Sequence, residues 1–311
     1  MSSQSSQSPE RTRADTEAMA GVASSSMPDS SGDMHNTAPT RFVDVGGTSF
    51  AYRRFGKPIG TPIVLLQHFM GNLDNYDPAI TDALAMGREV ILTDNTGVGH
   101  STGAAPETVA GMAADAASLV DALGLQQVDL FGFSMGGFVA QQITVERPEL
   151  VRRLMLVGTG PRGGDGMDEL APDVAPLFGK VDDPQDLMWL PIFFSPSEAG
   201  QAAGRRFLKR IRARTEDRDA PVSEATIAAH LAAAGEWGAA LPGSFDYLKG
   251  ISHPTLVVNG SNDIVVSTLN SYILQQNLPN AELILFPDSN HGSHFQFTEQ
   301  FNRAATDFVD R

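Results

Sequence analysis

The amino-acid sequence predicts an α/β fold in which helices cover both faces of a mostly parallel central sheet. Short apolar runs, each bounded by glycine, proline or charged residues, are typical of buried parallel strands. Such runs occupy residues 62–68, 89–94, 128–134, 154–159, 254–260 and 282–287. Helix-like segments separate them, most clearly Glu107 to Leu123, where apolar residues recur at intervals of three and four. This alternation of strands and helices is what predicts the α/β sheet.

A hairpin precedes the first buried run, and a long interval interrupts the alternation. Arg41 to Val45 and Ser49 to Arg54 are strand-like, and Gly46-Gly47 between them predicts a tight turn. The alternation lapses from about residue 161 to residue 250, where helices are expected at 183–190, 197–214 and 223–236. We therefore expect residues 41–160 and 251–311 to form the core, and residues 161–250 to form an inserted helical cap or lid.

Composition limits the classes of function. The chain has 311 residues, of which 41% are apolar and 19% charged, as expected for one large globular domain with an inserted lobe. Its 22 basic and 37 acidic side chains leave a net charge of −15, which argues against nucleic-acid or anionic membrane partners. There are no cysteines, so disulfides, thiolate metal sites and cysteine nucleophiles are excluded.

Residues 1–40 differ in composition from the rest of the chain. They are rich in serine, alanine and glycine and contain no apolar run of signal-peptide length. No later stretch approaches the ~20 apolar residues of a transmembrane helix. We expect a disordered N-terminal tail and a cytoplasmic location.

Gly132-Phe133-Ser134-Met135-Gly136 matches the pattern G-x-S-x-G at the end of an apolar run and the start of a helix-like one. A serine on such a sharp turn is held clear of the backbone, and the flanking glycines let strand and helix approach closely. The new helix directs its N-terminal amides toward the serine, where they stabilise negative charge. We predict that Ser134 is a nucleophile and that the Met135 amide is one oxyanion donor.

From Arg41 to Arg311 the chain resembles the α/β-hydrolase fold superfamily, whose nucleophile, acid and histidine follow in that order. The resemblance implies that the loop after the run 62–68 supplies a second oxyanion donor, the backbone amide of Phe69. The family's usual His-Gly pair is His-Phe here. Residues 94–101 are similar to the family's D-x-R-G-x-G-x-S turn, with Thr96 in place of arginine, and we interpret this turn as structural.

The serine needs a base within hydrogen-bond reach and a carboxylate that orients the base. Asp263 lies just beyond the run 254–260, at the sheet edge where α/β proteins collect catalytic groups, and is the predicted acid. An N-cap or turn role is its structural alternative, and Asp165 is the reserve candidate. His291 lies in the loop that follows the run 282–287, as the family's histidine does, and is the predicted base, whereas we expect His294 to be a packing residue at the final helix.

These residues predict an ester hydrolase that works through an acyl-enzyme on a small or medium apolar ester or lactone, with neither metal nor organic cofactor. We expect Met70, Trp189, Phe193 and Phe194 to contact this small-molecule substrate. The same triad also suits cofactor-free haloperoxidase or perhydrolase chemistry and carbon–carbon bond hydrolysis. A ligand receptor that keeps the fold with little turnover is the alternative from another class.

Overall fold

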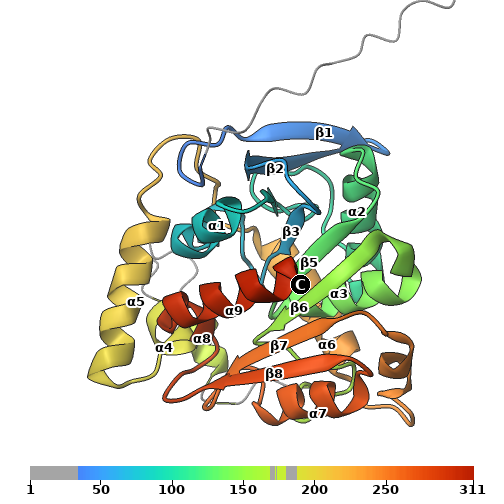
Figure 1. Cartoon of the computed structure of the whole chain (residues 1–311), viewed down its shortest axis with the longest axis vertical. Coiled ribbons are helices and arrows are strands. Elements are labelled where there is room, and N and C mark those ends of the chain that lie inside the picture. The colour runs from blue at the N-terminus through green and yellow to red at the C-terminus, as the bar shows by residue number, and fades with distance from the viewer. Residues whose placement is uncertain (1–33, 169–171, 173, 180–187) are drawn as a thin grey trace, which may run out of the picture.

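The computed structural model describes residues 34–168, 172, 174–179 and 188–311. Within these residues the centre is an eight-stranded sheet with the order β1-β2-β4-β3-β5-β6-β7-β8 (Figure 1). The strands are β1 (Arg41–Val45), β2 (Thr48–Gly56), β3 (Ile63–Leu66), β4 (Glu89–Thr93), β5 (Val128–Phe133), β6 (Val151–Val157), β7 (Thr255–Gly260) and β8 (Ala281–Phe286). The β1–β2 and β2–β4 pairs are antiparallel and the remaining pairs are parallel, so the predicted mostly parallel sheet is confirmed.

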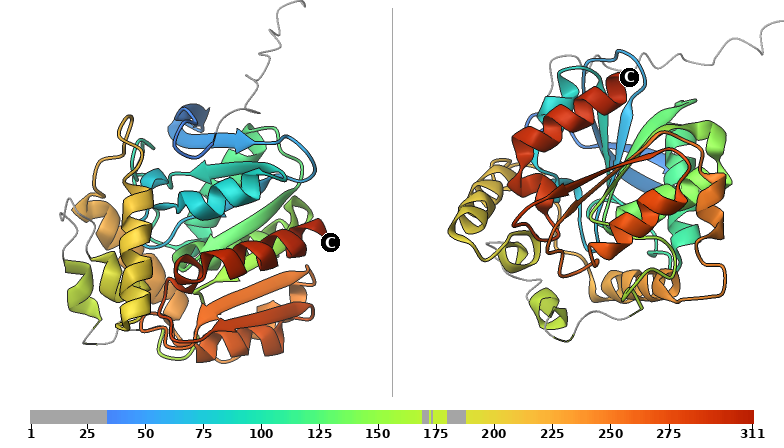
Figure 2. Two further views of the ribbon diagram at one scale, coloured as in Figure 1. Left: turned by 60° about the vertical axis from the view of Figure 1, so that its left-hand side comes forward. Right: turned by 60° about the horizontal axis from the view of Figure 1, so that its bottom comes forward.

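Helices cover both faces of the sheet (Figure 2). They are α1 (Pro78–Ala85), α2 (Val109–Ala122), α3 (Met135–Glu146), α4 (Trp189–Phe193), α5 (Glu198–Ile211), α6 (Glu224–Gly238), α7 (Leu269–Asn277), α8 (Ser293–Gln296) and α9 (Thr298–Asp310). Strand side chains alternate between two apolar cores: Ile63 and Leu65 face α1 and α9, whereas Val64 and Leu66 face α2 and α3. This two-sided burial explains why the central strands read as continuous apolar runs.

The segment between β6 and β7 carries α4, α5 and α6, at the interval where the alternation of the sequence lapses. The expected helices at 197–214 and 223–236 are present as α5 and α6. Of the helix expected at 183–190, residues 183–187 lie outside the described residues, and α4 begins at Trp189. The division into core and cap remains a prediction.

Residues 34–40 differ from the expected tail, whose first 33 residues lie outside the described part of the chain. His35 is buried; its backbone N–H donates to Asp82 Oδ1 (2.8 Å) and its Nδ1 lies 2.8 Å from Thr81 Oγ1, both on α1. Its ring packs edge-on against Phe55, with 6.0 Å between the centroids. The prediction that the tail extends to residue 40 is therefore wrong for this segment, because a histidine ring and Ala38 pack into the main core.

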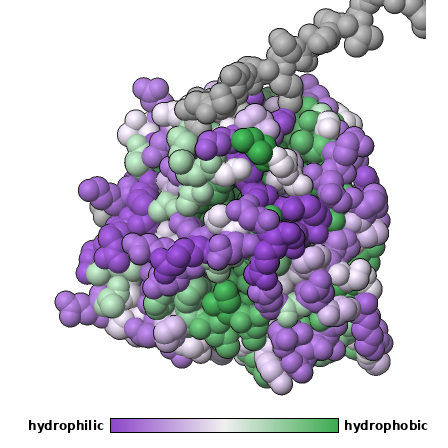
Figure 3. Space-filling view, in the orientation of Figure 1, coloured by the Kyte–Doolittle hydropathy of each residue, from purple (hydrophilic) through white to green (hydrophobic). Residues whose placement is uncertain are grey.

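The face of the molecule shown in Figure 3 is largely hydrophilic, with a hydrophobic area over β7 and β8 below α9. β8 is the edge strand of the sheet, and its Leu285 is 44% exposed.

Across the described ranges, every helix is too short or too polar to cross a bilayer.

The turn from β5 to α3 brings backbone segments into close contact. Gly132 lies against the backbone of Gly136 and Gly137, and Gly136 lies against the carbonyl oxygens of Leu66 and Gln67. A Cβ on Gly136 would collide with the carbonyl oxygen of Leu66, at the end of β3. This oxygen belongs to the backbone of the sheet, so it cannot move aside as the tip of a flexible side chain could. Glycine at these two positions is therefore required by close approach rather than by backbone angle.

We predict that Gly136→Ala lowers the free energy of unfolding by about 1–3 kcal/mol, because α3 must move away from β3 to make room for the methyl group. Urea denaturation measures the change. Gly235→Ala on α6 is the matched control, because its Cβ would meet no atom within 4 Å. This control should be stabilised by about 0.5–1 kcal/mol. Equal stability of the two variants would contradict the proposed close contact.

Candidate active site

Ser134 occupies the turn between β5 and α3 in a strained backbone conformation, with a positive φ of 54° and a ψ of −119°. Its N–H donates to Val157 O (2.9 Å), and its carbonyl accepts from Thr159 Oγ1 (2.8 Å). Both contacts come from the end of β6 and the residues that follow it. The strained backbone is therefore held by its neighbours, and the side chain projects from the carboxyl edge of the sheet.

A chain of hydrogen bonds joins Ser134 to His291 and Asp263. His291 Nε2 lies 2.9 Å from Ser134 Oγ, and His291 Nδ1 lies 2.8 Å from Asp263 Oδ2. The other Asp263 oxygen accepts from the backbone N–H groups of Val265 (2.8 Å) and Val266 (3.0 Å). Because a carboxylate can only accept, Nδ1 carries the ring proton and Nε2 is left to accept the serine hydroxyl.

Three segments that are far apart in the sequence bring these side chains together. Ser134 follows β5, Asp263 follows β7, and His291 follows β8, all at carboxyl ends of parallel strands. Each side chain is at least nine-tenths buried, so bulk water does not separate the three groups.

The two predicted oxyanion donors lie on the same cavity as Ser134. Met135 is the first residue of α3, so its N–H lies ahead of the point at which intrahelical hydrogen bonds begin. Phe69 follows β3, in a loop whose Gln67 side chain bridges the His68 N–H (3.0 Å) and the Asn72 carbonyl (3.1 Å). The donor role of both amides remains a prediction.

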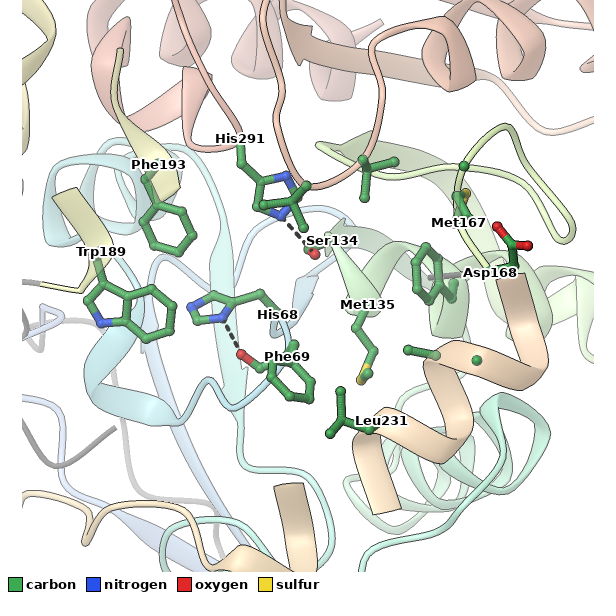
Figure 4. Close-up of a pocket in the computed structure, with 16 residues that line it drawn as sticks. His68, Phe69, Ser134, Met135, Met167, Asp168, Trp189, Phe193, Leu231 and His291 are labelled. Atoms are coloured by element: carbon green, nitrogen blue, oxygen red, sulfur yellow. Dashed lines mark hydrogen bonds between the residues drawn. The ribbon is translucent and has the colours of Figure 1, made fainter. Parts of the chain in front are cut away.

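The cavity beside Ser134 has a volume of about 160 Å³ and mostly apolar walls. Trp189 and Phe193 form one side, their rings stacked with centroids 4.8 Å apart, and Met167, Asp168 and Leu231 lie on the other side (Figure 4). A single water needs roughly 10–15 Å³ in such a space, so the cavity accommodates a chain of several carbon atoms.

The expected substrate contacts divide into two pairs. Trp189 and Phe193 line the cavity beside Ser134, and their contact with a substrate remains a prediction. Met70 and Phe194 are not among its lining residues: Met70 is buried in the main core, and Phe194 packs against Phe207 with 5.6 Å between the ring centroids. Phe193 is the last residue of α4, whereas Phe194 follows it in an extended backbone conformation, so the two neighbouring side chains leave the backbone in different directions.

Several lining residues were missed by the sequence reasoning: Phe138, Met167, Leu231, Val265 and Val266. Phe138 is four residues after Ser134 on α3, so helical spacing places it on the same side. Leu231, Ala234 and Gly235 follow the same i, i+3, i+4 spacing on α6. For Phe138, the spacing of four residues from Ser134 was the available signal in the sequence.

The alternative candidates lie elsewhere. Asp165 is exposed, and its backbone is held by the side chain of Asn270. His294 is buried behind Phe133, with 4.5 Å between the rings, and burial holds the pKa of His294 well below its usual value. The interpretation of His294 as a packing residue fits this environment.

Known proteins resemble this chain over most of its length. A family model described as alpha/beta hydrolase fold matches residues 61–298. A solved alpha/beta hydrolase fold protein from Chitinophaga pinensis is 41% identical, with a TM-score of 0.84, and the match covers 89% of this chain and 99% of that chain. A poly(3-hydroxyalkanoate) depolymerase of Ectopseudomonas oleovorans is 28% identical over 240 residues, which make up 76% of this chain and 80% of that relative. A Mycobacterium tuberculosis protein designated a candidate non-heme bromoperoxidase is 27% identical over 263 residues, which make up 80% of this chain and 94% of that relative.

A second group of titratable side chains lies where the turn at residues 94–101 meets the segment between α5 and α6. Asp94, His100 and Asp219 have donor atoms within 4.8 Å of one another. The Leu73 N–H donates to both carboxylates, at 2.9 Å from Asp94 Oδ1 and 3.1 Å from Asp219 Oδ2. The other two oxygens lie against the backbone N–H and the Nδ1 of His100.

These carboxyl groups hold protons unusually tightly. Burial raises the pKa of Asp94 well above its usual value, and the charge of Asp219 adds to the effect. Burial also raises the pKa of Asp219, with a further contribution from Asp74, which is itself paired with Arg53 (2.9 Å). Between the ordinary aspartate pKa and these raised values, the folded protein binds more protons than the unfolded chain, so the free energy of unfolding falls as pH rises through that interval.

We predict that Asp219→Asn weakens this pH dependence, because it removes one of the two charges that are brought together when the pH rises. Urea unfolding at about pH 4 and about pH 7 should show a smaller loss of stability in the variant than in the wild type. Asp246→Asn, which removes an exposed carboxylate paired with Lys249, should leave the wild-type dependence unchanged. An identical slope in Asp219→Asn and the wild type would refute the assignment.

Proposed function

The chain belongs to the alpha/beta hydrolase fold family, and on this premise we propose that it is a serine hydrolase that cleaves a small or medium apolar carboxylic ester or lactone. The observation that carries the proposal is the chain of hydrogen bonds that joins Ser134, His291 and Asp263. Ser134 and His291 also line an apolar cavity. The resemblance to a depolymerase of poly(3-hydroxyalkanoates), which are polyesters, supports an ester substrate.

In the proposed first half-reaction, Ser134 Oγ attacks the carbonyl carbon of the ester while His291 Nε2 takes the hydroxyl proton. The carbonyl oxygen becomes an oxyanion, which the amides of Met135 and Phe69 stabilise together with the N-terminal dipole of α3. When the tetrahedral intermediate collapses, the bond to the leaving oxygen breaks and His291 returns the proton to the alcohol. The acyl group is left esterified to Ser134.

Water completes the cycle. His291 Nε2 removes a proton from a water molecule as the water oxygen attacks the acyl carbon, and a second tetrahedral intermediate forms. Its collapse breaks the bond to Ser134 Oγ, which regains the proton from His291, and the carboxylic acid leaves. Asp263 stays ionised throughout, fixed by the Val265 and Val266 amides, and stabilises the protonated imidazole.

Perhydrolysis is the second candidate, because one relative is designated a candidate non-heme bromoperoxidase. In that reaction hydrogen peroxide takes the place of water in the second half-reaction and a peroxyacid leaves. An assay with acetate, bromide and peroxide separates the two activities, since the peroxyacid oxidises bromide to hypobromous acid, which brominates an added acceptor.

We predict that a fluorophosphonate labels the intact protein at Ser134 and that Ser134→Ala abolishes labelling. The variant should lower ester turnover by about a million-fold if serine and histidine act as a unit, as in other serine hydrolases. Mass spectrometry of the peptide that contains Ser134 locates the adduct. An unlabelled Ser134 in folded protein, or a loss of only a few-fold, would show that another group is the nucleophile.

We also predict that cavity size sets the chain-length preference, with p-nitrophenyl butanoate to octanoate favoured over the hexadecanoate. Leu231 is 47% exposed at the cavity wall, so Leu231→Trp should narrow the space with little effect on folding. It should lower kcat/KM about tenfold for the octanoate and leave the acetate nearly unchanged. Leu241→Trp is the matched control, because Leu241 is exposed and does not line the cavity. An equal effect of Leu231→Trp on all chain lengths would contradict the assignment of this cavity to the substrate.

A further inference from the structure

We propose that Thr159, which follows β6, is a positioning residue that directs the Met135 N–H toward the oxyanion of the reacting ester. The proposal rests on the proposed function, because it concerns the oxyanion donor on α3. Thr159 is buried and is not among the residues that line the cavity. Its part in the reaction therefore runs through the backbone of Ser134 and Met135 and not through contact with the substrate.

The peptide between Ser134 and Met135 carries the Ser134 carbonyl oxygen on one side and the Met135 N–H on the other. The oxygen and hydrogen of a trans peptide point in opposite directions, so a group that holds the oxygen also sets the direction of the hydrogen. Two donors hold this oxygen, Thr159 Oγ1 at 2.8 Å and the Gly137 N–H at 2.8 Å. Gly137 lies in the first turn of α3, so the carbonyl points along the helix and the Met135 N–H points out of its N-terminal end.

The Met135 N–H is available to bind an oxyanion. Met135 is the first residue of α3, and the opening N–H groups of a helix have no intrahelical acceptor. Within the described residues no other protein group accepts from this N–H. Ser134 and Met135 both line the cavity, so the N-terminal end of α3 faces the space beside the serine hydroxyl (Figure 4).

Backbone strain at Ser134 works against this orientation. Its φ of 54° and ψ of −119° are disfavoured for a residue other than glycine. At such a φ, the region open to other residues has a ψ of about 30–60°. Strain therefore favours a rotation about ψ, which would move the Ser134 oxygen away from its two donors and turn the Met135 N–H away from the serine side chain. The helix opposes that rotation through Gly137, and Thr159 opposes it from a separate segment of the chain.

Glycine at position 137 makes room for the threonine hydroxyl. A Cβ on Gly137 would lie 2.5 Å from Thr159 Oγ1, so any larger residue would displace the hydroxyl from the first turn of α3. Within the described part of the chain this hydroxyl makes no other hydrogen bond. Donation to a carbonyl oxygen also polarises the peptide, which makes its N–H a stronger donor. The Thr159 hydroxyl therefore both orients the Met135 N–H and strengthens it.

The test compares Thr159→Val and Thr159→Ala, which lack the hydroxyl, with Thr159→Ser, which keeps it. Valine matches the shape of threonine, so Thr159→Val retains the packing against Gly137. All three variants are measured as the full chain with the preferred p-nitrophenyl ester, for kcat and KM. They are also measured with butylboronic acid, whose tetrahedral adduct on Ser134 mimics the oxyanion.

Thr159→Val should lower kcat about 10-fold with KM changed less than about threefold, a part of the roughly 100- to 1,000-fold that a complete oxyanion donor contributes. The Ki of butylboronic acid should rise by a similar factor. Thr159→Ala should show the same two losses, because it also lacks the donor, and Thr159→Ser should recover most of both.

Thr144→Val supplies the matched control, because the buried Thr144 Oγ1 donates to Ala140 O (2.7 Å) further along the same helix. It should leave kcat and the boronate Ki unchanged. Wild-type kcat and Ki in folded Thr159→Val, or in Thr159→Ala if the valine variant does not fold, would overturn the proposal. So would an equal loss in Thr159→Ser or Thr144→Val, or a loss of kcat that leaves the boronate Ki intact. Failure of the proposed function is distinguishable, because the wild type itself would then show neither ester turnover nor labelling of Ser134.

Discussion

Ser134 is held in a strained backbone conformation with positive φ by the strands and helix that surround it. A non-glycine residue in such a conformation is disfavoured by about 1–3 kcal/mol, so it persists only where its neighbours outweigh that cost. Here β6 and Thr159 bind both backbone groups of the residue, and Gly132 and Gly136 let α3 pack against β5 and β3. The position of the serine hydroxyl, the direction of the α3 amides and the reach of His291 all follow from this one turn.

The other half of the site comes from the segment between β6 and β7. α4 contributes Trp189 and Phe193, and α6 contributes Leu231, to a cavity whose floor is Ser134 and Met135. Deep burial of these aromatic rings joins them to the main core, in which His68, Phe133 and Phe193 meet edge-on at centroid distances of 5.3–5.6 Å. The cavity and the core are therefore parts of one packed unit, and changes in α4 or α6 act on both.

Buried charged side chains lie at the junction between this segment and the core. Arg53 is fully buried and binds Asp74, while Asp94 and Asp219 share the Leu73 amide. Two carboxyl groups so placed cannot both ionise without a loss of stability. The packing of Asp219 against the turn at residues 94–101 therefore depends on whether the Asp94 carboxyl group is protonated. The net charge of −15 gives no hint of this arrangement, because it counts charges without locating them.

Much of the architecture was determined by the sequence alone, for physical reasons that act locally. Buried parallel strands need continuous apolar runs, and a sharp strand–helix turn needs small residues on either side of its serine, so both leave a pattern in the chain. The same holds for the loops that carry Asp263 and His291, since each directly follows an apolar run. By contrast, Met70 and Phe194 were assigned to the substrate and lie in the core. Residues 34–40 were assigned to the tail, but His35 binds α1 and Ala38 is buried in the core. Only the tertiary structure decided these, together with the contact of Thr159 with the Ser134 carbonyl, because the direction of a side chain and the meeting of segments 25 residues apart depend on packing, which leaves no local signature.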